Sequence, residues 1–194
     1  MEKLTRNDLL PLERYAAERA AFRARAIAHK LRRTLHLGPH MTLLFEDRLT
    51  VQYQVQEMLR IERIFEAEGI EEELRAYNPL IPDGANLKAT CLIEYADATV
   101  RARELARLRD IEHRFHAEVA GHPRVPALAD EDLGRSTADK TSSVHFLRFE
   151  FTAGMVAAAR GGTAISVGVA HDAYRADTGA LAEDVRASLA ADFG

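Results

Sequence analysis

The sequence has a single cysteine, no tryptophan, and only six prolines and eleven glycines among 194 residues. One cysteine, Cys91, cannot form a disulfide within the chain, and it cannot supply a multi-cysteine zinc or iron–sulfur site. Its setting in the strand-like run KATCLIEY indicates a buried thiol. The low content of proline and glycine excludes a disordered or linker-rich protein. What remains is the composition of an ordinary folded domain.

Long hydrophobic runs are also missing. No segment approaches the roughly 18 consecutive apolar residues of a membrane span, and the start, MEKLTRNDLLPLERY, contains no apolar stretch of signal-peptide length. We therefore expect a cytoplasmic protein without a membrane partner. The net charge of −4 provides no general attraction to nucleic acid. Basic residues gather in Arg19–Arg33, but a solvated helix face explains them more simply than a nucleic-acid site, for which affinity would fall steeply with salt.

The hydrophobic pattern alternates between helical and strand periods without a regular βαβ repeat. It predicts helices over 12–33, 47–68, 70–77, 98–120, 152–160 and 180–191, and strands over 34–37, 41–46, 87–95, 124–129, 144–151 and 163–170. No linker or internal repeat divides the chain, so a single domain over residues 1–194 is expected. We predict an α+β fold, with a mainly antiparallel sheet and long helices packed largely on one face.

The helix expected over 47–68 carries a carboxylate at an apolar position. Its apolar face comprises Val51, Val55, Met58 and Phe65. Glu62 falls in the middle of this face at 3.6 residues per turn. Because an unpaired buried carboxylate costs several kcal/mol, we predict that Glu62 is buried and paired with a cation, a hydrogen-bond donor or a metal.

The helix expected over 98–120 repeats the anomaly, since Glu104 and Glu112 lie on or beside its apolar face. Carboxylates and imidazoles together are common ligands of iron, manganese or zinc. However, Glu112 is followed three residues later by Phe115, so the Glu-x-x-His pattern of di-iron bundles is absent. Internal ion pairs with arginine are the simpler explanation, and a metal site is the alternative.

A polar segment of about fourteen residues precedes the strand over 144–151, which is long for a connection and typical of functional loops. The candidate binding residues in and beside it are Asp130, Asp132, Arg135, Asp139, Lys140 and His145. Ser142 and Ser143 lie close to His145, but no Gly-x-Ser-x-Gly elbow supports a nucleophile. Phosphate-binding glycine motifs are missing as well.

Three stretches carry a resemblance to a known family: LGPHMTLLFEDRLTVQYQVQEMLRIERI (37–64), YNPLIPDGANLKATCLIE (77–94) and DEDLGRSTADKTSSVHFLRFEF (130–151). Over nearly its whole length the chain resembles the bacterial domain-of-unknown-function family DUF3501. The resemblance implies a redox-related setting, because genes of this family often neighbour genes for rubrerythrin-like and iron–sulfur proteins. It also implies a tryptophan where this chain has His116, which argues against His116 as a ligand.

Two functions are therefore expected as alternatives. The first is an accessory protein that binds a ligand or a partner, such as a redox protein, through the loop at 130–143. The second is a metal-dependent redox or hydrolytic enzyme that uses iron, manganese or zinc. Its candidate ligands, which match the family pattern, are Glu62, Glu112, His113 and His145. The second alternative requires these side chains to converge within a few ångströms.

Overall fold

The computed structural model describes residues 1–129 and 140–194 of the protein. Its helices are η1 (Arg6–Asp8), α1 (Leu12–Lys30), α2 (Arg48–Glu62), α3 (Ala67–Tyr77), η2 (Asn78–Leu80), α4 (Ala98–Arg107), η3 (Ile111–His113), α5 (Ala153–Arg160) and α6 (Glu183–Ala190). Its strands are β1 (Thr34–His36), β2 (Met41–Phe45), β3 (Asn86–Ile93), β4 (Phe115–Val119), β5 (Val125–Leu128), β6 (Val144–Glu150), β7 (Ile165–His171) and β8 (Tyr174–Asp177). Within these residues, none of the helices combines the length and the hydropathy needed to cross a membrane.

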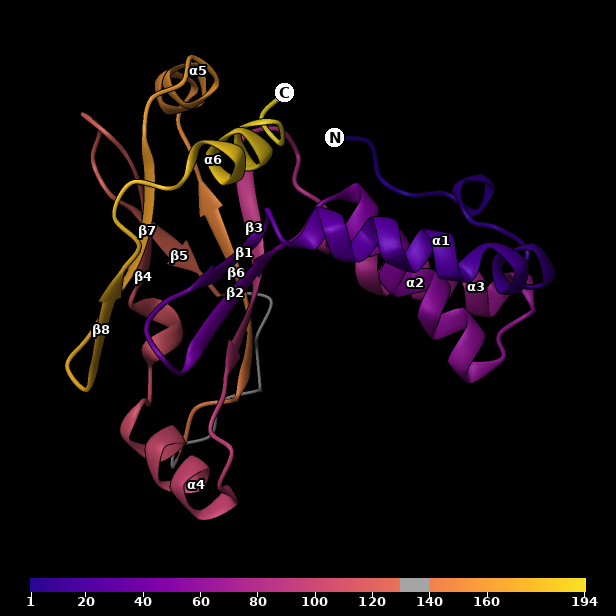
Figure 1. The fold of residues 1–194 in the computed structure, drawn as a ribbon, viewed down its shortest axis with the longest axis horizontal. Helices are drawn as coiled ribbons and strands as arrows, with labels where there is room; N and C mark the ends of the chain where they lie inside the picture. The colour runs from indigo at the N-terminus through magenta and orange to yellow at the C-terminus, as the bar shows by residue number, and fades with distance from the viewer. Residues whose placement is uncertain (130–139) are drawn as a thin grey trace.

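The described strands form one antiparallel sheet in the order β1-β2-β3-β6-β5-β4-β7-β8, which confirms the predicted α+β class with a mainly antiparallel sheet (Figure 1). The sheet curls so far that its two edge strands come into contact. The Tyr174 hydroxyl of β8 donates to the Leu37 carbonyl just after β1 at 2.5 Å. Gly38 permits this approach, since a Cβ there would lie 2.6 Å from the Tyr174 hydroxyl oxygen.

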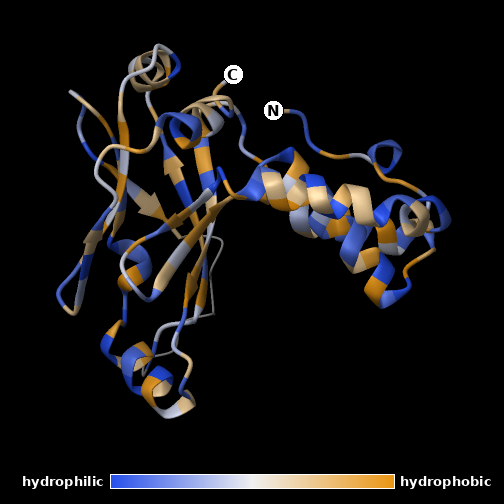
Figure 2. Cartoon of the chain, viewed as in Figure 1, coloured by the Kyte–Doolittle hydropathy of each residue, from blue (hydrophilic) through white to orange (hydrophobic). Residues whose placement is uncertain are grey.

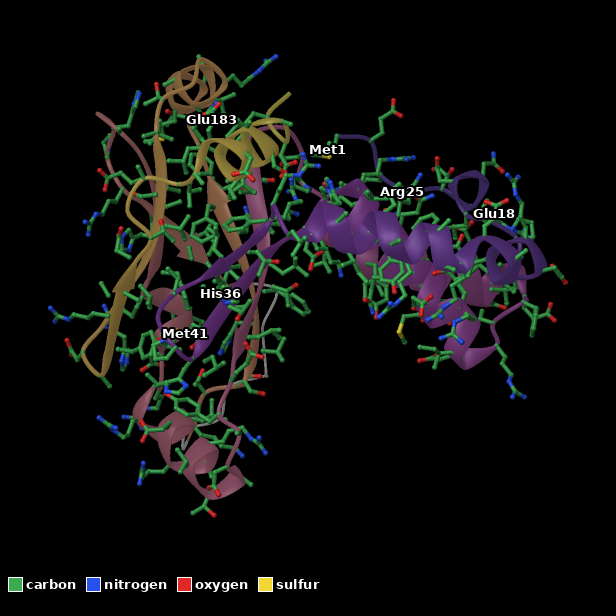
Figure 3. The ribbon with its side chains drawn as sticks, in the orientation of Figure 1. Met1, Glu18, Arg25, His36, Met41 and Glu183 are labelled. Atoms are coloured by element: carbon green, nitrogen blue, oxygen red, sulfur yellow. The ribbon has the colours of Figure 1, made fainter. Side chains whose placement is uncertain are left out.

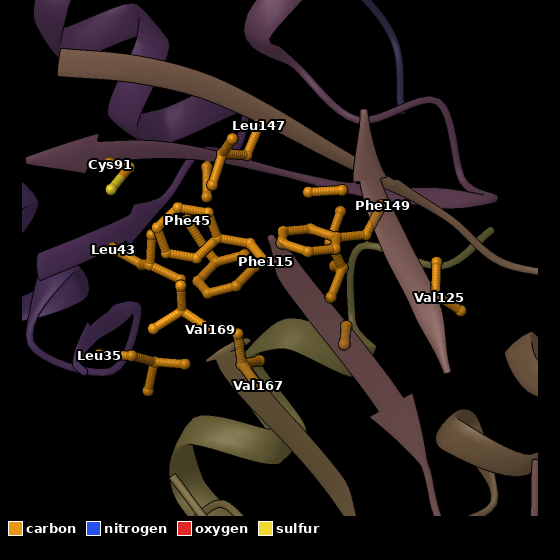
Figure 4. Close-up of a cluster of buried hydrophobic side chains, with 14 of the residues drawn as sticks. Leu35, Leu43, Phe45, Cys91, Phe115, Val125, Leu147, Phe149, Val167 and Val169 are labelled. Carbon is orange, nitrogen blue, oxygen red and sulfur yellow. The ribbon is translucent and has the colours of Figure 1, made fainter. Parts of the chain in front are cut away.

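The inner face of the curled sheet holds the main core (Figure 4). Strand alternation directs every second residue inward, as the buried positions Met41, Leu43 and Phe45 of β2 illustrate. The rings of Phe45 and Phe149 lie with their centroids 6.2 Å apart. Cys91 is buried in the same core, as its sequence setting predicts.

Helices α1, α2 and α3 form an arm that projects from the sheet and has a core of its own (Figures 1 and 2). The buried residues of the arm are Leu4, Val51, Val55, Leu59, Leu74 and Ile81. The arm displays charged side chains such as Glu18 and Arg25 far from the hairpin that contains His36 and Met41 (Figure 3). The longest helices therefore pack mainly on one another.

The arm meets the sheet at a buried cation, Arg33. Its guanidinium donates to the carbonyls of Phe45 and Glu46, at 3.0 and 3.1 Å, and to the Ser188 carbonyl of α6 at 3.0 Å. It also forms an ion pair with Asp192. Three segments that are far apart in the sequence are thus joined at one side chain.

The sequence-based prediction for Glu62 is wrong. α2 ends at Glu62, and Arg63 takes a left-handed conformation with φ of 56°, so the chain turns away at this point. The periodicity correctly places residue 62 in line with Val51, but the arm core ends one turn earlier, at Leu59. Glu62 is exposed, and Phe65 is 62% exposed.

The single helix predicted over 98–120 is also wrong. α4 ends at Arg107, Asp110 adopts a left-handed φ of 65°, and residues 115–119 pair as strand β4 with β7. Phe115 and Val119 are four residues apart, a spacing that fits one face of a helix and one face of a strand equally well. Ala117 distinguishes a strand from a helix here. It is buried together with Phe115 and Val119, and burial of every second residue is the pattern of a strand. Strand β8 was not predicted.

Candidate functional site

The predicted binding loop is only partly visible. Asp130, Asp132, Arg135 and Asp139 lie outside the described residues. Lys140 is exposed. His145 lies on β6, opposite Cys91 of β3, and its side chain is completely buried. Residues 140–145 therefore lead from the surface into the core of the sheet.

Two of the predicted metal ligands, Glu112 and His145, come together in a buried polar cluster with Thr141. The Thr141 hydroxyl lies 3.1 Å from Glu112 Oε2 and 2.9 Å from His145 Nε2. The imidazole and the carboxylate are themselves 4.0 Å apart. The 3₁₀ turn η3 places Glu112, and the start of β6 places His145. Thr141 thus bridges a helical turn and a strand.

The contacts of His145 determine where its proton lies. Nε2 is 3.0 Å from the Ser142 carbonyl, which can only accept, so Nε2 carries a hydrogen. The Ser142 carbonyl and the Thr141 oxygen share this hydrogen, and the Thr141 hydroxyl donates its own hydrogen to the Glu112 carboxylate. The cluster positions the segment before β6, and metal ligation by Nε2 would require this network to rearrange.

The other two predicted metal ligands lie elsewhere. His113 is exposed at the end of η3, and Glu62 is exposed at the end of α2 in the arm. Among residues 1–129 and 140–194, no group of three or more His, Cys, Asp and Glu side chains is placed to hold a metal ion. Of the four predicted metal ligands, only Glu112 and His145 therefore lie close to each other.

A groove of about 890 Å³ lies at the same end of the sheet. Its lining includes the aromatic and charged side chains of His40, Tyr95, Glu94 and Arg101. The His40 ring stacks on Tyr95 with centroids 4.1 Å apart. Arg101 donates to the Tyr95 carbonyl at 3.1 Å. Partial burial raises the pKa of the Tyr95 phenol. The groove thus combines an aromatic platform with both signs of charge.

The predicted loop and the groove are physically connected. Ser143 and Val144, at the end of the loop, line the groove, and the Ser143 carbonyl accepts from the Ile93 amide at 2.8 Å. Sequence reasoning missed His40 and Tyr95 as site residues. A signal was present, since antiparallel pairing of β2 with β3 brings the start of one strand and the end of the other to the same edge.

The paired carboxylate of α2 is Glu57, and sequence reasoning missed it. Arg19 donates two hydrogen bonds to Glu57, both at 2.8 Å, and the Tyr15 hydroxyl donates a third at 2.5 Å. Hydrogen bonds from Arg19 lower the pKa of Glu57 to about 2, against the opposing effect of burial. Arg19, at the start of the basic stretch, thus serves the packing of α1 on α2.

Comparison with known proteins identifies the family of the chain but assigns no activity to it. A crystal structure of a protein of unknown function from Burkholderia pseudomallei is 51% identical to this chain, covers 100% of both chains, and superposes with a TM-score of 0.94. No curated protein matches. The family described as "Protein of unknown function (DUF3501)" matches residues 3–193. The chain therefore belongs to the DUF3501 family.

Proposed function

We propose that the protein is a non-catalytic accessory protein that binds a partner protein or ligand through the groove lined by His40, Tyr95 and Arg101. The observation that carries this proposal is the groove itself, about 890 Å³ in volume and adjacent to the anchored end of the polar loop. The redox-related setting rests on the family resemblance alone. Cytoplasmic location and the lack of a nucleic-acid partner remain predictions.

The chemistry of the groove favours a polypeptide segment as its occupant. The volume is at the upper end of the range for a small-molecule site, and the groove is open to solvent. Leu92 and Val144, which face each other on β3 and β6, provide an apolar floor. Arg101 can bind a carboxylate with two hydrogen bonds, and the stacked rings of His40 and Tyr95 offer a flat apolar face. We expect an acidic and aromatic or aliphatic segment to bind.

The test compares two charge reversals. Candidate partners are captured from the native host, purified, and titrated against the wild-type protein, Arg101→Glu and Arg175→Glu. Arg175 is a matched control because it lies on β8, does not line the groove, and is 74% exposed. We expect Arg101→Glu to weaken binding about tenfold or more, and the control to bind as the wild type does. Equal affinities for both variants would place the binding site elsewhere.

A second candidate function, a metal-dependent redox or hydrolytic enzyme, is favoured by the convergence of Glu112 and His145. The experiment is a metal analysis of untagged protein purified anaerobically from its native host. Near-stoichiometric iron, manganese or zinc that is lost in Glu112→Gln would favour the enzyme over the accessory protein. Metal that is retained by Glu112→Gln would remove this pair from the candidate ligands.

A further inference from the structure

A second, smaller pocket lies where the arm meets the outer face of the sheet. It has a volume of about 270 Å³. The arm contributes Val51 and Tyr77 to its lining, and the sheet contributes Thr90 and Phe146. Glu46, in the short connection between β2 and α2, also lines it. Half of its ten lining residues are apolar or aromatic, and Glu46 is the one carboxylate among them.

Glu46 is an electrostatic anomaly. Its residue is only 8% exposed, and its two carboxylate oxygens accept from the Thr50 hydroxyl at 2.6 Å and the Thr90 hydroxyl at 2.7 Å. Yet within residues 1–129 and 140–194, no ion pair to this carboxylate lies within 4.0 Å. Arg33 touches the backbone carbonyl of Glu46, while its charge is directed to Asp47 and Asp192.

Among the described residues that line the pocket, Lys30 is the only cation, and no ion pair joins it to Glu46. Lys30 lines the pocket, but its ammonium group lies over the ring of Tyr53, 5.5 Å from the centroid. A carboxylate has about four acceptor positions, and the two hydroxyls occupy two of them. A buried charge is stable only when a counter-charge or further hydrogen bonds compensate it. The pocket provides the space for a group that supplies both.

We propose that this pocket binds a small organic cation with a primary ammonium group, which donates to Glu46. An ammonium group has three donors and a positive charge, which match the free acceptor positions of the carboxylate. Aromatic side chains such as Phe146 and Tyr77 attract organic cations, and the apolar walls accommodate a short alkyl chain. This site is separate from the groove and does not depend on the function proposed above.

The experiment titrates the full-length protein calorimetrically with n-butylammonium chloride and, separately, with n-butanol at equal ionic strength. The two probes share size and apolar chain and differ in charge. We expect a saturable isotherm for n-butylammonium only, with about tenfold or greater loss of affinity in Glu46→Gln. Glu104→Gln is the matched control, because Glu104 is another buried carboxylate but is paired with Arg103 and Arg107. It should bind as the wild type does.

A second variant keeps the proposal testable if Glu46→Gln does not fold. Leu44→Trp fills the pocket from the outer face of β2 while leaving Glu46 in place, and it should abolish n-butylammonium binding. Three results would overturn the proposal. They are no saturable binding of n-butylammonium, equal binding of n-butanol, or unchanged affinity in the wild type, Glu46→Gln and Leu44→Trp.

Discussion

The helical arm and the curled sheet are held together in different ways. The sheet encloses a large continuous core with aromatic rings at its centre (Figure 4). The arm has a much smaller core and adds side-chain contacts to the backbone of its N-terminal segment. Gln56 contacts the amide and carbonyl of Leu10, and Asn78 contacts those of Leu4. The side-chain amides of Gln56 and Asn78 thus hold the segment that precedes α1.

The difference indicates that the sheet and the arm have unequal free energies of local unfolding. Apolar burial stabilises the sheet over its whole length, whereas the arm depends on a few apolar residues and on polar contacts that water can replace. Local unfolding follows such differences in buried contacts. We therefore expect the arm to open at a lower free energy than the sheet, with the Arg33 contacts as the boundary between them.

The largest effect is expected in the sheet. Phe149 is completely buried and packs against Phe45, so Phe149→Ala should lower the free energy of unfolding by about 3–5 kcal/mol. The measurement is urea denaturation followed by circular dichroism, together with hydrogen exchange. Protection should decrease in the sheet, while the arm amides, which exchange through an opening that leaves the sheet folded, should change much less. An equal loss of protection in the arm would mean that the arm opens only when the whole protein unfolds, contrary to the comparison.

The corresponding change in the arm is Leu59→Ala. Leu59 is buried at the outer end of the arm core, and its truncation should cost about 2–3 kcal/mol. Hydrogen exchange should show faster opening of α1, α2 and α3, while strands β3 and β6 keep wild-type protection. Equal loss of protection in β3 would mean that arm and sheet unfold as one unit.

The boundary between the two regions should respond to pH. Burial raises the pKa of Asp192 to about 6, against the opposing charge of Arg33. A raised pKa means that the folded protein binds this proton more tightly than the unfolded chain. The contribution of Asp192 protonation to the free energy of unfolding is therefore fully present below about pH 4, and it is lost as the pH rises through about 6.

The variant that tests this dependence is Asp192→Asn, which retains an oxygen acceptor for Arg33 but cannot titrate. The wild type should lose stability relative to Asp192→Asn between about pH 4 and 7, by about 2–3 kcal/mol at most. Thermal unfolding of both proteins across this pH range measures the difference. Parallel pH profiles would show that Asp192 does not titrate in this window.

The smallest expected change in stability is the difference between two glutamates of α2, Glu57 and Glu62. Hydrogen bonds from Arg19 lower the pKa of Glu57 to about 2, so its contribution is present above about pH 4.5 and is lost as the pH falls through about 2. At pH 7, Glu57→Gln should cost about 1 kcal/mol in urea denaturation. Glu62→Gln is the control and should change stability by less than about 0.5 kcal/mol, because Glu62 is exposed. A larger cost for Glu62 would restore the original prediction.

Much of the fold could be predicted from local signals. The hairpin of β1 and β2, the start of α2 and the strand β6 follow from turn residues, caps and alternation, and Asp47 caps α2 by accepting from the Thr50 amide at 2.9 Å. The prediction of one helix over 98–120 was wrong because the spacing of Phe115 and Val119 fits both a helix and a strand. The prediction that Glu62 is buried was wrong because a periodic pattern shows which way a side chain points from the helix but not how far the core extends.

The candidate site was predicted in part. Glu112 and His145 were two of the four candidate metal ligands, and they are the two that lie close together, with Thr141 between them. The groove was missed, because His40, Tyr95 and Arg101 belong to three segments; antiparallel pairing of β2 with β3 could have placed His40 beside Tyr95, but the sequence does not show where α4 brings Arg101. Glu46 gave no periodic signal, since it lies in a connection between a strand and a helix.

The Arg33 contacts impose an order on folding. Arg33 follows α1, yet its guanidinium is satisfied by Ser188 and Asp192 near the other end of the chain. During synthesis the arm and the β1–β2 hairpin leave the ribosome long before residues 188–192 exist. Such distant contacts form late, because a long loop must close first. Until then the guanidinium has the carbonyls of Phe45 and Glu46 and the Asp47 carboxylate as partners but lacks Ser188 and Asp192, so the link between Arg33 and the C-terminal helix forms only once α6 has been made.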